Sequence, residues 1–168
     1  MTNTVDTEPS TTLIEKLSGI RVAMLTTTDE SGRLHSRPMA TQETSADGAL
    51  WFFTSNNAQV ALNIQASREV NLSYVDSNLQ RYVSVAGRAW ILHDTDRIQE
   101  LWSPAVAAWF PRGLNDPDLT LIRVDVTEAD YWDGGEGKFV RLSGFIRELL
   151  GEKPAAARDR GHLDLGTA

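Results

Sequence analysis

The fold class is decided by the stretch Tyr82-Val83-Ser84-Val85-Ala86-Gly87-Arg88-Ala89-Trp90-Ile91-Leu92. Its β-branched and aromatic residues predict a β-strand, the longest in the chain. Gly87 in the middle of this run indicates a bulge or a bend. A strand that bends at its centre is typical of a small barrel, because a sheet must turn corners in order to close.

Shorter runs on both sides of this strand predict an antiparallel sheet. The turn Asp29-Glu30-Ser31-Gly32 joins two of them into a hairpin, with glycine where a positive φ is needed. The run at residues 49–54 is so apolar that we expect it to be buried on both faces. The expected strands cover residues 20–28, 34–41, 49–54, 69–76, 82–92, 119–126 and 129–132.

Short helices are expected between the strands and at the end of the domain. They begin at Thr12, at Asn57, after Asp94 and at Pro104, and a last helix covers 139–150. Because strands do not alternate with long helices, a parallel doubly wound sheet is disfavoured, and a mainly β fold with peripheral helices is predicted. The expected organisation is a flexible tail at 1–11, one domain at 12–150 and a disordered tail at 151–168.

Composition excludes several classes of function. The 168 residues include no cysteine, which removes disulfides, thiolate nucleophiles and cysteine-ligated metals. The three histidines lie far apart in the sequence, so a histidine-rich metal centre is not expected. A net charge of −7 disfavours nucleic acid as a partner. No run approaches about 18 apolar residues and no signal segment is evident, so we expect a cytoplasmic protein without a membrane partner.

Familiar catalytic motifs are missing from the sequence. Gly137-Lys138 lacks the upstream glycine of a phosphate-binding P-loop, and no βαβ pattern surrounds the glycines at 134–137. There is no Gly-x-Ser-x-Gly elbow. If the protein performs chemistry, we therefore expect a bound organic cofactor to supply it.

One constellation favours an anion site. Arg37-Pro38-Met39 lies late in a strand, and an inward-facing arginine there would require an anion. Thr54 and Ser55 end the apolar strand just before a helix, where free backbone N–H groups bind phosphate well. An arginine on an exposed strand face is the alternative interpretation.

These segments resemble the pyridoxamine-phosphate-oxidase-like flavin-binding split barrels, and within them the general stress protein 26 group. The resemblance covers about residues 12–133, and its most specific part is the series of tryptophans and prolines between residues 101 and 119. The residues that carry it are Ser36-Arg37-Pro38-Met39, Leu50-Trp51-Phe52-Phe53-Thr54, Val70-Asn71-Leu72-Ser73-Tyr74, Arg81 to Ala89, Leu101-Trp102-Ser103-Pro104, Ala108-Trp109-Phe110-Pro111, Asp116-Pro117-Asp118-Leu119 and Tyr131-Trp132-Asp133.

The resemblance implies a fold, a cofactor and an assembly. The fold would be a six- to seven-stranded antiparallel split β-barrel of the FMN-binding type. Members of this family form homodimers that hold FMN in a groove between the subunits, and FAD is a second possible cofactor. The cofactor-binding residues implied here are Arg37, Pro38, Met39, Phe53, Thr54, Ser55, Gln59, Trp132 and Trp109.

The resemblance also implies roles for several of these residues. Arg37 would hold the phosphate of the flavin. Phe53, Thr54 and Ser55 would lie along the ring and the phosphate. Trp132 would reach the ring region from the partner subunit, and Trp109 would form a pocket wall. Core packing is the alternative role for both tryptophans.

Gln59 departs from the family pattern, because relatives usually place a lysine there to meet the phosphate. The expected consequences are weaker FMN binding or a preference for another flavin. True pyridoxamine-phosphate oxidase activity is disfavoured, since Arg141-Leu142-Ser143 lacks the histidine of the family's Arg-x-His pattern. Three functions stay open: a stress-related flavin-dependent oxidoreductase, a non-catalytic flavin carrier or sensor, and a split-barrel dimer that binds heme or a deazaflavin.

Overall fold

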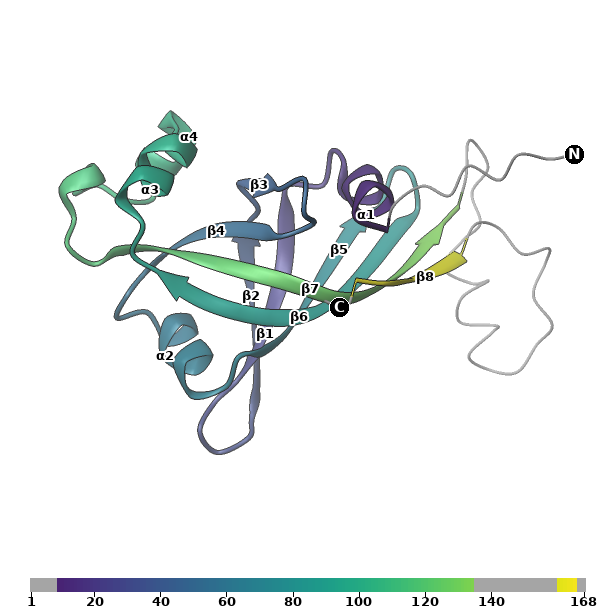
Figure 1. The fold of residues 1–168 in the computed structure, drawn as a ribbon, viewed down its shortest axis with the longest axis horizontal. Helices are drawn as coiled ribbons and strands as arrows, with labels where there is room; N and C mark the ends of the chain where they lie inside the picture. Colours follow the sequence, from purple (N-terminus) through teal and green to yellow (C-terminus); the bar gives the residue numbers. More distant parts are fainter. Residues whose placement is uncertain (1–8, 135–159, 166–168) are drawn as a thin grey trace, which may run out of the picture.

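A single curled antiparallel sheet dominates the computed structural model, which describes residues 9–134 and 160–165 (Figure 1). Seven strands follow the order β2-β1-β5-β6-β7-β4-β3, and β8 pairs with β7. The strands are β1 (Val22–Thr28), β2 (Leu34–Ala40), β3 (Glu43–Thr44), β4 (Leu50–Ser55), β5 (Glu69–Asp76), β6 (Arg81–Leu92), β7 (Leu119–Asp133) and β8 (Arg160–Asp164). The expected split-barrel fold is confirmed.

Short helices surround the sheet. They are α1 (Pro9–Leu17), α2 (Gln59–Ala66), α3 (Thr95–Leu101), α4 (Pro104–Ala107) and the 3-10 helix η1 (Gly113–Asn115). In Figure 1, α3 and α4 lie at one end of the long β6–β7 pair, and α1 and β8 lie at the other. Among the helices of residues 9–134 and 160–165, none is long and apolar enough to cross a bilayer.

The bulge expected at Gly87 is present. The pairing of β6 with β7 shifts register between Ala86 and Gly87. A Cβ atom at Gly87 would lie 2.5 Å from the carbonyl oxygen of Asp125, so the close approach of the two strands requires glycine here. The bulge bends the longest strand pair of the sheet.

The apolar strand β4 is buried on both faces, as predicted. Leu50 and Phe52 belong to the main core inside the curled sheet. Trp51 and Phe53 point to the opposite face, where they form a second core with Ile98 of α3 and other residues of that layer. The helices after β6 therefore cover the outside of β4, which explains why this strand lacks a polar face.

Three details differ from the sequence-based expectations. The strand expected to break between residues 126 and 129 is continuous in β7, because Thr127 is the extra residue of the bulge and donates its hydroxyl to the Ala86 carbonyl. α1 begins at Pro9, inside the expected tail, and proline suits the first turn of a helix. The tail expected to be disordered contains β8, since Leu163 packs against the main core. The helix expected at 139–150 lies outside the described residues.

Candidate functional site

Arg37 points toward the inside of the curled sheet. It pairs with the fully buried Leu25 of β1, and Met39, two residues further along β2, packs against the main core on the same face. The guanidinium Nη1 donates to Thr27 Oγ1 at 2.7 Å and lies 3.4 Å from the Leu25 carbonyl oxygen. Partial burial lowers the pKa of Arg37, but an arginine stays charged at any physiological pH.

A chain of hydrogen bonds links this arginine to the first residue of α2. Thr27 Oγ1 also accepts from Asn63 Nδ2 at 3.0 Å, and Asn63 Oδ1 accepts from Gln59 Nε2 at 2.8 Å. Thr27 and Asn63 are 1% and 2% exposed. We call Arg37, Thr27, Asn63 and Gln59 the relay. It connects β2, β1 and α2, and so brings together Arg37 and Gln59, two residues singled out in the sequence.

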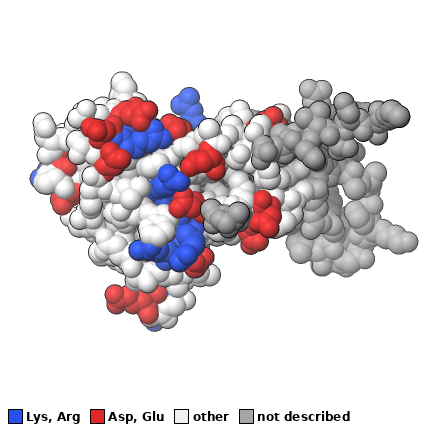
Figure 2. Space-filling model, viewed as in Figure 1, with Lys and Arg blue, Asp and Glu red and all other residues white. Residues whose placement is uncertain are grey.

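Arg37 differs from most other arginines in its surroundings. On the face shown in Figure 2, basic side chains lie among acidic ones. Ion pairs join Arg81 to Asp133, Arg88 to Glu69, Arg97 to Glu43, Arg112 to Asp116 and Arg123 to Asp125. Within residues 9–134 and 160–165, by contrast, Arg37 forms no ion pair with a carboxylate, and its hydrogen bonds go to a hydroxyl and a carbonyl. A half-buried cation of this kind is suited to an anionic ligand.

The start of α2 supplies further groups for an anion. Ala58 caps this helix without a side-chain acceptor, so the first-turn N–H groups have no side-chain partner. Ser55, at the end of β4, donates its hydroxyl to Asn57 Oδ1 at 2.8 Å. Asn56 Oδ1 is buried without a hydrogen-bond partner in the part of the chain that the structure describes. A ligand that carries both phosphate oxygens and hydroxyl groups could engage these donors and this acceptor.

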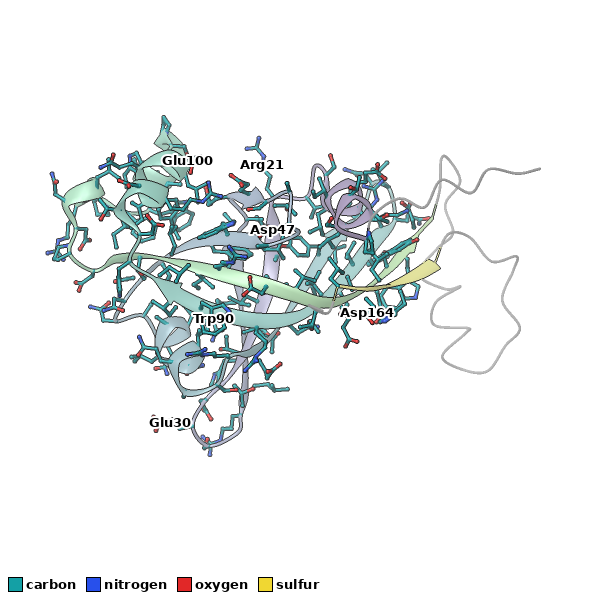
Figure 3. The ribbon with its side chains drawn as sticks, viewed as in Figure 1. Arg21, Glu30, Asp47, Trp90, Glu100 and Asp164 are labelled. Carbon is teal, nitrogen blue, oxygen red and sulfur yellow. The ribbon has the colours of Figure 1, made fainter. Side chains whose placement is uncertain are left out.

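An open groove of about 640 Å³ lies against the relay, between the β1–β2 turn and α2. Gln59 and Asn63 of the relay line this groove together with Glu30 and Leu62, whereas Arg37 and Thr27 do not line it. Figure 3 shows Glu30 at the tip of the hairpin that projects past α2. The volume lies within the range of small-molecule sites, which is about 300–1,000 Å³.

Several predicted site residues have side chains committed elsewhere. Phe53 packs in the second core, with ring centroids 5.8 Å from Trp102 and 6.1 Å from Phe110. Met39 packs against the main core. Pro38 is exposed on the outer face of the sheet, opposite Met24. Phe53 therefore offers a ligand mainly its backbone, whereas the side chain of Met39 is only partly buried.

The two predicted tryptophans do not approach Arg37 within one chain. Trp132 lies on β7 opposite Tyr82, and its neighbour Tyr131 packs against the main core, so Trp132 points to the outer face of the sheet. Trp109 follows α4 and is 82% exposed. A contact of either ring with a ligand at Arg37 stays a prediction, and for Trp132 it would require a second copy of the chain.

Sequence reasoning overlooked Thr27 and Asn63. Both are polar residues at core positions: Thr27 continues the inward alternation of Ala23 and Leu25, and Asn63 lies on the buried face of α2 beside Val60 and Ile64. A buried polar side chain needs a partner, so these departures from apolar patterning were a usable signal.

Comparisons with known proteins identify a matching family and several similar proteins. A sequence model of the family described as pyridoxamine 5'-phosphate oxidase like matches residues 8–154. Protein bli-3 of Neurospora crassa is 28% identical over 145 residues, which cover 80% of this chain and 69% of that protein.

Solved structures of similar fold include the general stress FMN/FAD binding protein of Xanthomonas citri. It is 29% identical, with 79% of this chain and 93% of that chain covered and a TM-score of 0.65. A protein assigned as general stress protein 26 from a Jannaschia species is 23% identical, with 90% and 95% covered and a TM-score of 0.68. At 23% identity, the likeness to the Jannaschia protein shows only a shared fold.

Proposed function

The chain belongs to the pyridoxamine 5'-phosphate oxidase-like family, as its sequence predicts, and from this premise we propose that it binds a flavin nucleotide, FMN first, between two copies of itself. One observation carries the proposal: Arg37 is a half-buried cation that forms no ion pair within residues 9–134 and 160–165, and the relay ties it to the start of α2. In this proposal Arg37 meets the phosphate of the flavin, and the N–H groups at the start of α2 lie alongside it.

The second copy is needed because the proposed site residues occupy both faces of the sheet. Arg37 faces inward, whereas Trp132 faces outward. The outer face also exposes a group of apolar side chains. By register it comprises Val22, Met24, Pro38, Val75 and Tyr82, which we call the outer apolar face. A two-fold mate on this face would cover these side chains and bring its own Trp132 to the site.

The flavin would supply electron or hydride transfer when bound. The chain's own side chains at the site are suited to binding and orientation, since no member of the relay carries a group that exchanges a proton near neutral pH. Arg37 and the α2 N–H groups would hold the phosphate, and the open groove between α2 and the hairpin reaches Gln59, the first residue of α2. This inventory supports a non-catalytic carrier or sensor as well as an oxidoreductase whose chemistry is entirely the flavin's.

Two further parts of the proposal concern the biological role and the class of ligand. The name of the Xanthomonas citri relative favours a stress-related role. Heme is the less favoured alternative: its candidate ligands would be His35 and His93, and His35 Nε2, which lies 2.8 Å from Asp29 Oδ2, would have to give up this partner.

A flavin titration tests the proposal. Purified protein is stripped of bound ligand and titrated with FMN, FAD and riboflavin, with flavin fluorescence quenching as the signal. We expect FMN to bind more tightly than riboflavin, because only FMN has a phosphate for Arg37. Failure of all three flavins to bind would overturn the proposal. Oxidation of reduced nicotinamide in the presence of bound flavin then separates an oxidoreductase from a carrier.

A further inference from the structure

We propose that Thr27 and Asn63 are positioning residues that set the phosphate selectivity of this site, by fixing the direction in which the Arg37 guanidinium points. The inference rests on the proposed function, because it concerns the same anion site. It assigns a role to two buried side chains that the proposed function does not yet use.

The relay is buried at its centre. Thr27 and Asn63 are nearly inaccessible to solvent, on two different elements that pack together. A polar group taken out of water destabilises the fold unless it is hydrogen-bonded, and apolar residues of the same shape would avoid that penalty. The network converges on one charged group, the Arg37 guanidinium.

The hydrogen bonds of the relay have defined donors and acceptors. Gln59 Nε2 donates to Asn63 Oδ1, which turns Asn63 Nδ2 toward Thr27. Thr27 Oγ1 accepts from Asn63 Nδ2 and from Arg37 Nη1, and these two bonds occupy both lone pairs of the hydroxyl. The hydroxyl oxygen therefore has a fixed place, and it holds Arg37 Nη1 there.

The Arg37 guanidinium uses only one of its edges within the protein. Nη1 is engaged by Thr27 and lies near the Leu25 carbonyl. The hydrogen bonds of Arg37 within the described ranges all use Nη1, so the Nε and Nη2 N–H groups keep their capacity to donate. They form the planar pair of donors that matches two oxygens of one phosphate. The relay thus commits one edge of Arg37 to the protein and leaves the bidentate edge for the ligand.

The test compares isosteric removal of the relay with matched controls. Thr27→Val and Asn63→Leu remove the polar atoms at nearly constant volume, and Thr27→Ser keeps the hydroxyl. Thr120→Val is the control, because Thr120 is also fully buried but donates its hydroxyl to the Leu92 carbonyl instead of joining the relay. For each variant, the ratio of the riboflavin and FMN dissociation constants measures how much the phosphate group contributes to binding affinity. Melting temperature with and without inorganic phosphate measures anion binding in the absence of flavin.

We expect Thr27→Val and Asn63→Leu to lower the FMN preference by about tenfold, the equivalent of one hydrogen bond to a charged group, and to abolish the stabilisation by inorganic phosphate. Thr27→Ser and Thr120→Val should keep the preference for FMN and the stabilisation by inorganic phosphate. A merely structural relay would weaken FMN and riboflavin equally, and that result overturns the inference. If the wild type binds no flavin but phosphate still stabilises it through Arg37 and Thr27, the proposed function fails and this inference stands. If phosphate has no effect on the wild type, the inference fails.

Discussion

Arg37 and Trp132 point to opposite faces of the same sheet. Arg37 faces the inside of the curl together with Met39, whereas Trp132 lies beside Tyr82 on the outside. A single chain therefore cannot bring these two side chains to one small ligand. If both bind the flavin, each site must combine Arg37 of one copy with Trp132 of another.

Complementation between variants tests this shared site. We expect Arg37→Ala and Trp132→Ala each to weaken FMN binding as separate dimers. When the two variants are mixed and allowed to exchange subunits, each mixed dimer has one intact site and one doubly altered site. Random pairing then restores about a quarter of all sites to wild-type affinity, which a titration resolves as a tight fraction. No recovery after verified exchange would contradict a site built from two copies.

The outer apolar face should carry the dimer contact. Wild-type protein is expected to have about twice the chain mass of 18.6 kDa in light scattering. Met24→Glu, at a position 43% exposed in one chain, should give monomers, because an unpaired charge buried in an interface costs about 2–5 kcal/mol. Leu62→Glu is the matched control: Leu62 is 47% exposed but lies on α2, away from this face. A wild-type monomer would contradict this prediction.

Arg37 should contribute to binding of the flavin's phosphate and not to binding of its ring. Arg37→Ala is expected to weaken FMN by about 1.5–3 kcal/mol, roughly 10- to 150-fold, and to leave riboflavin nearly unchanged. Arg21→Ala, at an exposed arginine on the approach to β1, provides the control for net charge. Equal losses for FMN and riboflavin would mean that Arg37 supports the fold or the ring.

Gly87 is expected to be essential for stability. Alanine at this position would place a Cβ 2.5 Å from the Asp125 carbonyl oxygen and 2.9 Å from a methyl carbon of Val124. We expect Gly87→Ala to lower the free energy of unfolding by about 1–3 kcal/mol, the usual penalty of overpacking. Urea unfolding followed by tryptophan fluorescence measures the loss. Arg88→Ala, next to it on β6, removes only an exposed ion pair with Glu69 and should change stability little.

The sequence predicted those features that depend on local patterns. Gly87 marked the bulge because a glycine inside a strand is typical of a bulge or a close backbone approach, and the apolar run of β4 indicated burial on both faces. The predicted break between residues 126 and 129 was wrong. Thr127 and Glu128 interrupt the apolar pattern as a loop would, but β7 continues through them with a bulge. The relay could not be predicted as a unit, since its members lie on three elements and only tertiary packing brings Thr27 to Asn63.

Gln59→Lys tests whether the phosphate lies at the start of α2. Gln59 is the exposed first residue of α2, and a lysine there would place a cation beside the first-turn N–H groups while its ammonium could still donate to Asn63 Oδ1. We expect FMN to bind about 1 kcal/mol more tightly, with a smaller gain as salt rises, because part of the attraction is screened. Riboflavin should gain no affinity from this substitution.

A cation at the positive end of the helix dipole destabilises the empty protein by about 0.3–1 kcal/mol, so the melting temperature should fall without ligand and rise with FMN. Gln65→Lys, at the other end of α2 in the same groove, controls for general attraction and should give a smaller gain. If Gln59→Lys leaves FMN affinity unchanged, or if Gln65→Lys matches it, the phosphate does not lie at the start of α2.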